Sequence, residues 1–563
     1  RYDRRKKYFR LKDGSFLDVS DGQLRELSAL KNGLQISDRE LKKGKTQVPA
    51  YRAMYLDSQL KGGDLIKVEK DNAFRALIRN MQTMEEHKFQ IPREQEKILR
   101  GYQKEGFYWI KTLKHNQFGG ILADDMGLGK TLQVITFLWS EFQESAPGEN
   151  RRALVITPAS LVFNWMNEIE RFAPGLPATV VTGDVKERKA LIKNAGEREV
   201  LITSYDLLKR DLKAYQNLDF AVQIIDEAQY IKNHGTQVAK AVKEIRSEFR
   251  LALTGTPVEN RLSELWSIFD FLMPGFLYSY EKFRKEIELP AVQYSNSDAM
   301  ERLQKMIRPF VLRRLKRDVL KDLPDKLEKD MFSPLESEQK ELYEAHTERL
   351  RLMLGMQSDA EFRTSKLQIL AEITRLRQIC CYPGLVYEGY KGNSSKLEMC
   401  MELVQNAVNG GHKILLFSQF TTMLDVLAVR LKKAKVSFYM LTGATSKEKR
   451  AQMVQAFNED DTSVFCISLK AGGTGLNLTA ADIVIHYDPW WNLAVQNQAT
   501  DRAHRIGQQN VVSVYRLFMK DTIEERIRAL QERKRELADE ILSGEGIGQA
   551  LISREEVLEL LGR

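Results

Sequence analysis

Short apolar runs alternate with helical stretches in two separate parts of this 563-residue chain, and this rhythm restricts the fold more than any other feature. The first set of runs begins at positions 120, 153, 200, 222 and 251. The second set begins at positions 413, 438, 464, 483 and 511. Short apolar runs between helices are typical of parallel strands that are buried on both faces. The sequence therefore predicts an α/β protein with two lobes, each built on a parallel sheet.

The same rhythm divides the chain into five regions. We expect a small accessory region with a hairpin and helices, a nucleotide-binding lobe, a helical insertion with a linker, a second lobe and a helical tail. Their boundaries are expected at residues 1–92, 93–260, 261–390, 391–520 and 521–563. The first residue is Arg rather than Met, which predicts a fragment of a longer protein or a processed form.

Composition restricts the partners and the compartment. The formal net charge of +9 favours a polyanionic partner, because phosphates that a protein neutralises release their counterions. No stretch approaches about 18 consecutive apolar residues, and the start lacks a signal peptide, so we expect an intracellular protein that does not enter a membrane. The four cysteines have no metal-binding spacing, which predicts buried, reduced thiols.

A glycine-rich loop at 124–131 follows the first predicted strand and precedes a predicted helix. Its sequence, Asp-Asp-Met-Gly-Leu-Gly-Lys-Thr, offers backbone amides, a helix N-terminus and Lys130 to phosphates, and the Thr131 hydroxyl suits Mg²⁺. Asp124 stands where the usual pattern has its first glycine. The strand before the loop argues against a chance match, so we predict a nucleotide-phosphate site.

Two carboxylates follow a later strand of the same lobe, in the sequence Ile-Ile-Asp-Glu-Ala-Gln at 224–229. An Asp-Glu pair is usually a solvated turn, but the phosphate loop upstream makes a catalytic pair the better interpretation. Asp226 can hold Mg²⁺ through water, and Glu227 can orient or deprotonate the attacking water.

Two arginines of the second lobe can complete this site. Arg502 and Arg505 lie three residues apart in a predicted helix and therefore on one face, where both can point at a nucleotide in the facing lobe. A solvated helical face is the alternative, and the glycines at 472, 473 and 475 argue against it. Because the charge that develops in phosphoryl transfer needs further cations, ATP is predicted to join the two lobes.

These motifs occur in the order and spacing of helicase superfamily two, and the chain resembles its Swi/Snf-type translocases over residues 93–530. Beside the glycine-rich loop, the resemblance is carried by Leu-Thr-Gly-Thr-Pro-Val-Glu-Asn at 253–260, Phe-Val-Leu-Arg-Arg-Leu-Lys at 310–316, Leu-Arg-Gln-Ile-Cys-Cys-Tyr-Pro at 376–383, Asp-Pro-Trp-Trp-Asn at 488–492 and Asp-Arg-Ala-His-Arg-Ile-Gly-Gln at 501–508. It implies two RecA-like lobes with family-specific helical insertions. Since no histone-reading segment is evident, we expect a bacterial member.

The resemblance also implies roles for individual residues. Gln103 would contact adenine, and the nucleotide would further be held by Asp125, Gly127, Leu128, Gly129, Lys130, Thr131 and Gly475. Catalysis would depend on Lys130, Asp226, Glu227, Arg502 and Arg505, with Mg²⁺ held by Thr131 and Asp226. Hydrolysis would be linked to movement by Gln229, Thr254, Gly255, Thr256 and Pro257. Duplex DNA would contact Trp165, Ser204, Tyr205, Ser418, Gln419, Lys470 and Trp490.

Two positions need a further comment. Gln229 stands where many relatives have histidine, so we expect coupling rather than hydrolysis to be tuned there. Trp490 and Trp491 are adjacent aromatic residues, and such pairs pack in a core or between lobes more often than they contact DNA.

The expected function is hydrolysis of ATP, stimulated by double-stranded DNA, with movement along the duplex that displaces or remodels bound protein without stable strand separation. One alternative is a strand-separating helicase, although no wedge hairpin is evident in the second lobe. Another is an ATP-switched binding module that acts on a partner such as RNA polymerase. The expected cofactors are ATP and Mg²⁺. We expect a monomer, in the cytoplasm at the nucleoid of a bacterium or in the nucleus of a eukaryote.

Overall fold

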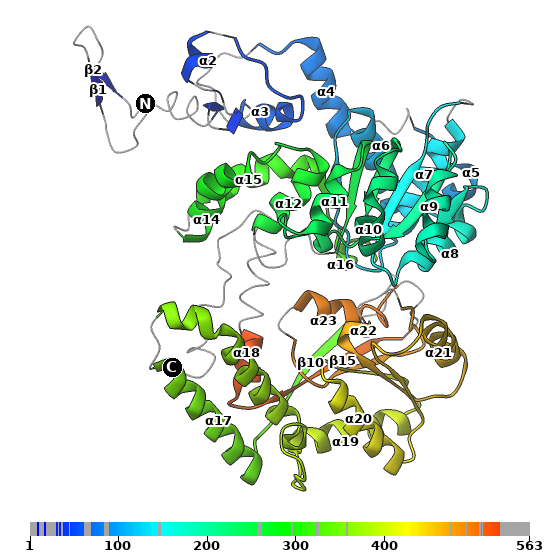
Figure 1. Cartoon of the computed structure of the whole chain (residues 1–563), viewed down its shortest axis with the longest axis vertical. Coiled ribbons are helices and arrows are strands. Elements are labelled where there is room, and N and C mark those ends of the chain that lie inside the picture. Colours follow the sequence, from blue (N-terminus) through cyan, green and yellow to red (C-terminus); the bar gives the residue numbers. More distant parts are fainter. Residues whose placement is uncertain are drawn as a thin grey trace.

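The computed structural model has two α/β lobes stacked along the long axis of the molecule, with the N-terminal helices on the side of lobe 1 away from lobe 2 (Figure 1). This arrangement confirms the predicted fold class. The structure describes residues 8–10, 16–18, 30–31, 33–34, 36, 38–43, 45–60, 69–83, 89–144, 148–255, 262–293, 297–320, 326–355, 359–472, 476–490, 493–505, 508 and 510–529.

Lobe 1 is built on a parallel sheet of seven strands. Their order across the sheet is β5 (Ala178–Val180), β6 (Val200–Ser204), β4 (Ala153–Thr157), β7 (Phe220–Ile225), β8 (Ser247–Leu253), β3 (Gly120–Leu122) and β9 (Val311–Leu312). The five predicted runs all form strands here. Because β4, β7, β8 and β3 are neighbours, the loops at their carboxyl ends meet at one edge, where ligands bind in such sheets.

Helices cover both faces of this sheet and explain why its central strands are fully buried. In chain order they are α5 (Arg93–Glu96), α6 (Gly101–His115), α7 (Lys130–Glu144), α8 (Val162–Phe172), α9 (Val185–Lys193), α10 (Tyr205–Tyr215), α11 (Gln237–Glu244) and α12 (Leu262–Leu272). The short helix α13 (Tyr280–Phe283) follows α12.

Lobe 2 has a parallel sheet of six strands. Their order is β10 (Lys326–Ser333), β15 (Val512–Met519), β14 (Ile483–His486), β11 (Ile414–Ser418), β13 (Val464–Ser468) and β12 (Phe438–Leu441). The helices of this lobe are α19 (Ser395–Asn409), α20 (Thr421–Lys433), α21 (Lys447–Glu459), α22 (Leu469–Gly472) and α23 (Leu493–Thr500). The second set of predicted runs therefore also forms strands.

The insertion at 261–390 is not purely helical, which corrects the sequence-based expectation. It contains α14 (Leu289–Gln293), α15 (Ser297–Ile307), α16 (Lys316–Val319), α17 (Ser337–Gly355) and α18 (Asp359–Cys381), but it also supplies β9 to lobe 1 and β10 to lobe 2. β10 pairs with β15 from Lys326 opposite Val512 to Ser333 opposite Met519. Each of these strands lies at the edge of its sheet, so neither shows the continuous apolar run of a central strand.

The N-terminal region forms the predicted hairpin, with β1 (Tyr8–Arg10) antiparallel to β2 (Phe16–Asp18). It continues with α2 (Asp38–Lys42), α3 (Arg52–Leu60) and α4 (Asn72–Thr83). Arg52 attaches α3 to lobe 1, because its Nη2 donates to the backbone oxygen of Phe276 at 2.5 Å. Of the predicted C-terminal tail, the part beyond 529 lies outside the described residues.

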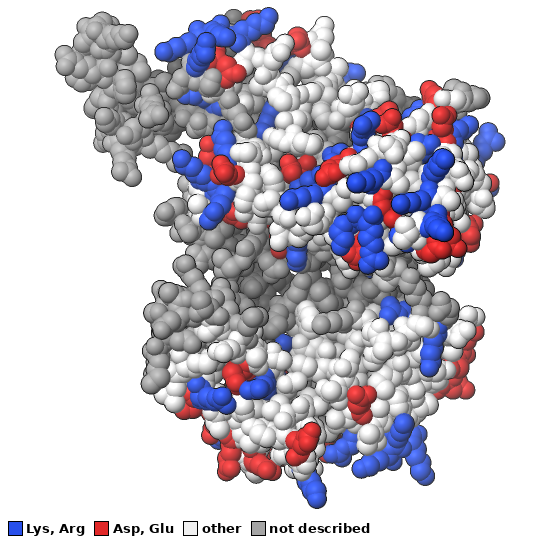
Figure 2. Space-filling model, viewed as in Figure 1, with Lys and Arg blue, Asp and Glu red and all other residues white. Residues whose placement is uncertain are grey.

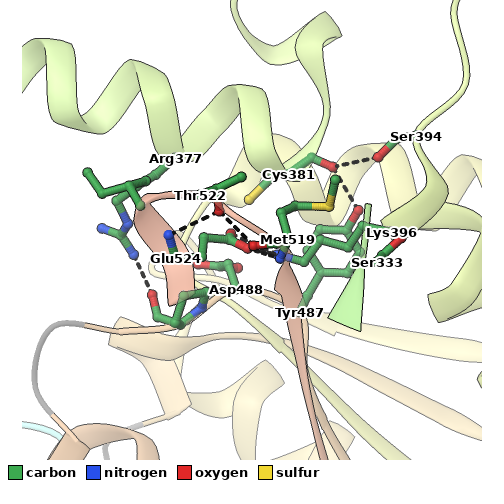
Figure 3. A network of polar contacts seen from close by, with 12 residues as sticks. Ser333, Arg377, Cys381, Ser394, Lys396, Tyr487, Asp488, Met519, Thr522 and Glu524 are labelled. Carbon is green, nitrogen blue, oxygen red and sulfur yellow. Dashed lines mark hydrogen bonds and ion pairs between the residues drawn. The ribbon is translucent and has the colours of Figure 1, made fainter. Parts of the chain in front are cut away.

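Buried polar contacts hold the outer part of lobe 2 together (Figure 3). Lys396 in α19 donates to both carboxylate oxygens of Glu524 at 2.8 Å, and both side chains are fully buried. The backbone N–H of Met519 also donates to Glu524 at 2.8 Å. In the same cluster Arg377 of α18 donates to the backbone oxygen of Pro489. The cluster thus joins two helices to the segments after β14 and β15.

All four cysteines are buried and free, as predicted for reduced thiols. Among the helices that the structure describes, none is long and apolar enough to cross a membrane.

Candidate active site between the lobes

The glycine-rich loop connects β3 to α7. Gly127 and Gly129 have φ values of 86° and 77°, a conformation that favours glycine at both positions. Lys130 is the first residue of α7, so its side chain and the helix N-terminus lie at the same point. The Lys130 ammonium donates to the backbone oxygen of Asp124 at 2.5 Å and is thus held inside the loop. The loop therefore offers backbone amides and a cation to the same anion.

Asp124, the departure from the usual glycine, has a partner far along the chain. Its fully buried carboxylate accepts two hydrogen bonds from Arg314, from Nε to Oδ1 at 2.9 Å and from Nη2 to Oδ2 at 2.5 Å. Gln133 donates to the same Oδ2 at 3.2 Å. Bidentate arginine–carboxylate pairs are strong and directional. This pair fixes the start of the phosphate loop to the segment that follows β9.

Gln103, the predicted adenine contact, lies against the phosphate loop. Its Oε1 accepts from the Arg100 N–H at 2.9 Å, and its Nε2 donates to the backbone oxygen of Leu128 at 3.0 Å. The side chain is buried, so an adenine contact requires the amide to turn or to use its second N–H. The adenine role stays a prediction.

Asp226 and Glu227 follow β7, two strands from the phosphate loop. Asp226 Oδ2 accepts hydrogen bonds from Trp165 Nε1 at 2.8 Å and Thr157 Oγ1 at 3.2 Å, and Oδ1 accepts from the Glu227 N–H at 2.9 Å. Glu227 has a φ of 52°, and backbone strain of this kind concentrates at functional sites. Burial raises the pKa of both carboxyl groups, and repulsion from Asp226 adds to the rise at Glu227.

Gln229 bridges Glu227 to the end of the neighbouring strand β8. Its Nε2 donates to Glu227 Oε2 at 2.7 Å, and its Oε1 accepts from Thr254 Oγ1 at 3.1 Å. Gln229 therefore contacts both Thr254, which is also predicted for coupling, and a predicted catalytic residue. Gly255 follows Thr254 directly, and a side chain there would meet open space. Residues 256 and 257, named in the same prediction, lie outside the described residues.

The two arginines lie after a helix rather than within one. Helix α23 ends at Thr500, and the chain then turns, with N–H groups of Ala503 and His504 donating to the Thr500 backbone oxygen at 3.1 and 3.3 Å. The prediction that Arg502 and Arg505 share one helical face is therefore wrong.

Arg502 and Arg505 reach different parts of lobe 1. Arg502 is 4% exposed and lies within electrostatic range of Glu227. Burial, together with the charge of Arg505, lowers the pKa of Arg502 to about 10, so the guanidinium stays charged at neutral pH. Arg505 instead lies within electrostatic range of Glu168 in α8, and burial lowers its pKa as well.

The lobes meet at the phosphate loop. The Cβ atom of Arg505 lies 3.2 Å from the point that a side-chain carbon would occupy on Gly127. A second contact joins Lys316, which follows β9, to Asp501 at 2.6 Å. Residues of both lobes are therefore close enough to contact one nucleotide. Position 475, the remaining predicted nucleotide contact, lies outside the described residues.

Two residues predicted to contact DNA are buried and hydrogen-bonded inside the protein, which favours a supporting role over the predicted contact. Trp165 is 1% exposed and donates to Asp226, so it supports the nucleotide site. Ser418 is fully buried, and its hydroxyl donates to Asp488 Oδ1 at 2.5 Å. The N–H of Gln419 lies 3.3 Å from both oxygens of the same carboxylate, which places this residue beside the strand end rather than in an open groove.

A cavity of about 300 Å³ lies between the lobes. Lobe 1 lines it with Pro158, Ala159, Ser160, Ser204, Tyr205, Asp206 and Tyr230, and lobe 2 with Gly443, Arg450 and Ala471. Tyr205 also donates to the Asp226 backbone oxygen at 2.7 Å, so the cavity adjoins the nucleotide site. We call this cavity the interlobe groove.

Four predicted DNA contacts remain to be placed. Ser204 and Tyr205 line the interlobe groove, but both are buried and their hydroxyls are bonded within lobe 1, that of Ser204 to the Leu207 N–H at 3.3 Å and that of Tyr205 to the Asp226 backbone oxygen. Their DNA contact stays a prediction. Lys470 lies in α22 beside Ala471 of the groove, but its side chain is outside the described part of the structure. Trp490 is half-buried against the core of lobe 2. The structure therefore favours the packing interpretation of Trp490.

Two parts of the chain match different protein families. Residues 102–385 match the SNF2-related domain, and residues 395–507 match the helicase conserved C-terminal domain. The chain belongs to the SNF2 family. This membership confirms the predicted family and the predicted enzyme class, the ATP-hydrolysing helicases. Residues 1–92 match the domain described as bacterial SNF2 helicase associated, in line with the expected bacterial member.

Relatives of this SNF2 chain include bacterial helicases and an archaeal ATPase. An uncharacterized ATP-dependent helicase of Mycoplasma pneumoniae is 40% identical over 86% of this chain and 46% of its own length. The putative ATP-dependent helicase/translocase YwqA of Bacillus subtilis is 39% identical over 85% of this chain and 53% of its own. The chain spans about half the length of these curated relatives. A solved SWI2/SNF2 ATPase core of Sulfolobus solfataricus in complex with double-stranded DNA is 38% identical, with a TM-score of 0.40 over 79% of this chain and 93% of that chain.

Sequence reasoning missed two residues of this SNF2 site, Arg314 and Lys316. The basic stretch at 313–317 was the available signal, but a run of cations usually marks a solvated surface. The structure places Arg314 and Lys316 in the site because β9 is adjacent to β3. The end of β9 therefore lies beside the phosphate loop, which follows β3.

Proposed function

We propose that this SNF2-family chain is a DNA-stimulated ATPase that moves along double-stranded DNA and displaces or remodels bound protein without stable strand separation. The observation that carries the proposal is the approach of Arg505 to Gly127 of the phosphate loop, at 3.2 Å between the two β-carbon positions. A nucleotide held by residues of both lobes makes the spacing of the lobes depend on its phosphates. Hydrolysis can then drive a change in that spacing.

The residues of the site have separable tasks in this proposal. Lys130 exchanges the backbone oxygen of Asp124 for a phosphate oxygen, and the loop amides bind the same group. Glu227 orients the attacking water, and its raised pKa suits acceptance of a proton. Arg502 and Arg505 stabilise the charge that develops on transfer, in the manner of arginine fingers.

Mg²⁺ fits the oxygen groups at this edge of the sheet. The Thr131 hydroxyl and the Asp226 carboxylate would hold it, together with phosphate oxygens and water, because Mg²⁺ takes few protein ligands. Three hydrogen bonds reach Asp226, and a carboxylate has about four acceptor positions, so capacity remains for a metal or its water. Bound Mg²⁺ would neutralise phosphate charge during transfer.

The interlobe groove is the place we propose for DNA. Figure 2 shows Lys and Arg mixed with Asp and Glu over the face in view, so this face has no large patch of one sign. The groove is instead lined by Ser160 and Ser204 of lobe 1 and by Arg450 of lobe 2. If the phosphates of a DNA strand bind both lobes, a change in the lobe spacing would move the protein along that strand. The net charge of +9 supports a polyanionic partner.

We also propose a class of partner and an oligomeric state. A motor that follows an intact duplex meets any protein in its path, so the proposed partners are DNA-bound proteins, RNA polymerase among them. One chain supplies every residue of the site, which supports action as a monomer. In a bacterium the proposed place of action is the nucleoid.

Parallel measurements of ATP turnover with double-stranded DNA, single-stranded DNA and RNA test the nucleic-acid class. We expect the largest stimulation with the duplex. A triplex-displacement assay separates the remaining alternatives, because a duplex-tracking motor strips a third strand without melting the duplex. Opening of forked duplexes without triplex displacement would favour a strand-separating helicase. A change in DNA or protein affinity with ATP, without either activity, would favour a binding switch.

A further inference from the structure

A segment of lobe 1 is attached to the phosphate loop through the backbone. The N–H of Asp125 donates to the Arg314 oxygen at 2.9 Å, and Asp125 Oδ2 accepts from the Lys316 N–H at 3.0 Å. The Arg314 side chain is bound to Asp124, as described above. The position of residues 314–316 is thus set by two consecutive residues of the loop.

The Lys316 side chain extends from this segment to lobe 2. Its Nζ lies 2.6 Å from Asp501 Oδ1 and donates to the backbone oxygen of His504 at 2.6 Å. Only 11% of the Lys316 side chain and 18% of the Asp501 side chain are exposed. Water therefore screens this ion pair less than it screens a surface pair.

Each of the two residues that Lys316 contacts directly precedes an arginine of lobe 2. Asp501 precedes Arg502, and His504 precedes Arg505. Lys316 Cε lies 3.5 Å from the same point on Gly127 that Arg505 Cβ approaches to 3.2 Å. Lys316 thus contacts the turn at two residues and also lies beside the phosphate loop.

We propose that Lys316 is a positioning residue that sets the arginine turn of lobe 2 against the phosphate loop of lobe 1. The inference rests on the proposed ATPase function, because it concerns the same site. Lys316 transmits the position of the loop to Arg502 and Arg505 through Asp501 and the His504 carbonyl. Its role is separate from contact with the nucleotide, which Lys130 makes.

Two variants remove the contact from opposite sides, Lys316→Met and Asp501→Asn. Steady-state ATP turnover with saturating duplex DNA is measured for each variant, for the double variant and for Lys316→Arg. A displacement of about 1 Å at a reacting centre can cost about a hundredfold. We expect kcat to fall between about ten- and a hundredfold, with the KM for ATP within about threefold of wild type. The double variant should be no worse than Lys316→Met, and Lys316→Arg should recover part of the rate.

A second readout reports the lobe spacing directly. Cysteines introduced at the exposed positions Lys189 in α9 and Lys433 in α20 can carry a fluorophore pair, since the native cysteines are buried. Energy transfer should fall in Lys316→Met and Asp501→Asn but not in Lys305→Met, which removes an exposed ion pair with Glu301 at 2.8 Å. Unchanged kcat and unchanged energy transfer in both contact variants would overturn the inference. If the wild type hydrolyses no ATP, the proposed function fails, while the energy-transfer comparison still decides the role of Lys316.

Discussion

The indole nitrogen of Trp165 lies 2.8 Å from Oδ2 of Asp226, and this hydrogen bond joins α8 to the end of β7. A hydrogen bond to a charged group contributes about 1.5–3 kcal/mol. Trp165→Phe keeps an aromatic side chain but removes this bond, so we expect kcat for ATP hydrolysis to fall about tenfold or more. Affinity for duplex DNA, measured by fluorescence anisotropy, should stay within about twofold.

Trp139→Phe is the matched control for this substitution. Trp139 stacks on Phe142 with ring centroids 5.4 Å apart, and its indole nitrogen has no hydrogen-bond partner among the described residues. Trp139→Phe should therefore leave ATP turnover unchanged. If Trp165→Phe instead weakened DNA binding and preserved turnover, Trp165 would be a DNA contact after all.

Gln229 is expected to govern coupling, because it connects Glu227 to Thr254 on the neighbouring strand. Coupling free energies of about 1–3 kcal/mol correspond to factors of about 5–150. Gln229→Ala should therefore lower triplex displacement per ATP hydrolysed by about tenfold, with a smaller effect on hydrolysis itself. Thr254→Val should act similarly, and the double variant should resemble either single one. Equal losses of displacement and hydrolysis would show that Gln229 serves hydrolysis instead.

The buried pair of Lys396 and Glu524 predicts a strong effect on stability. Burial opposes both charges, yet the carboxylate raises the pKa of Lys396 above its usual value. Removing one partner leaves a buried charge unpaired, which costs about 3–5 kcal/mol. Glu524→Gln and Lys396→Met should each lower the denaturation midpoint of lobe 2, and their combination should recover most of the loss. An effect of either single variant as small as that of Lys305→Met would contradict this account.

Acid should destabilise lobe 2 through His486. Burial lowers the pKa of His486 to about 3, and the charge of Arg516 is the second cause. The Nε2 atom of His486 lies 2.8 Å from Thr500 Oγ1. Below the ordinary value of 6.5 the unfolded chain binds a proton that the folded chain does not. Stability present above pH 6.5 is therefore lost as the pH falls, by roughly 2 kcal/mol between pH 6.5 and 4.5.

His486→Gln is expected to remove this part of the acid sensitivity. Urea denaturation at several pH values measures it, because the wild-type and variant curves of stability against pH should converge toward acid. Parallel curves between pH 6.5 and 4.5 would show that His486 is protonated in the folded protein.

The central strands and the two main motifs were predictable from the sequence, because buried parallel strands are continuous apolar runs and the phosphate loop has a fixed spacing. The edge strand β10 was not, since it carries the charged sequence Lys-Leu-Glu-Lys-Asp and its first four residues are exposed. Contacts such as that of Arg314 with Asp124 depend on which strands become neighbours, and residue spacing along the chain does not show that. The turn at Arg502 and Arg505 was predicted as helix because the pattern continues beyond Thr500, where α23 ends.

The most direct test of a site shared between the lobes is ATP turnover by Arg505→Ala, with and without duplex DNA. Arg430→Ala in α20 is the control, since Arg430 pairs only distantly, at 3.6 Å, with Glu398. Arginine fingers contribute about 10³- to 10⁵-fold to rate, so DNA-stimulated hydrolysis should be abolished in Arg505→Ala while DNA affinity is retained. Turnover of Arg505→Ala close to that of the wild type would contradict the account.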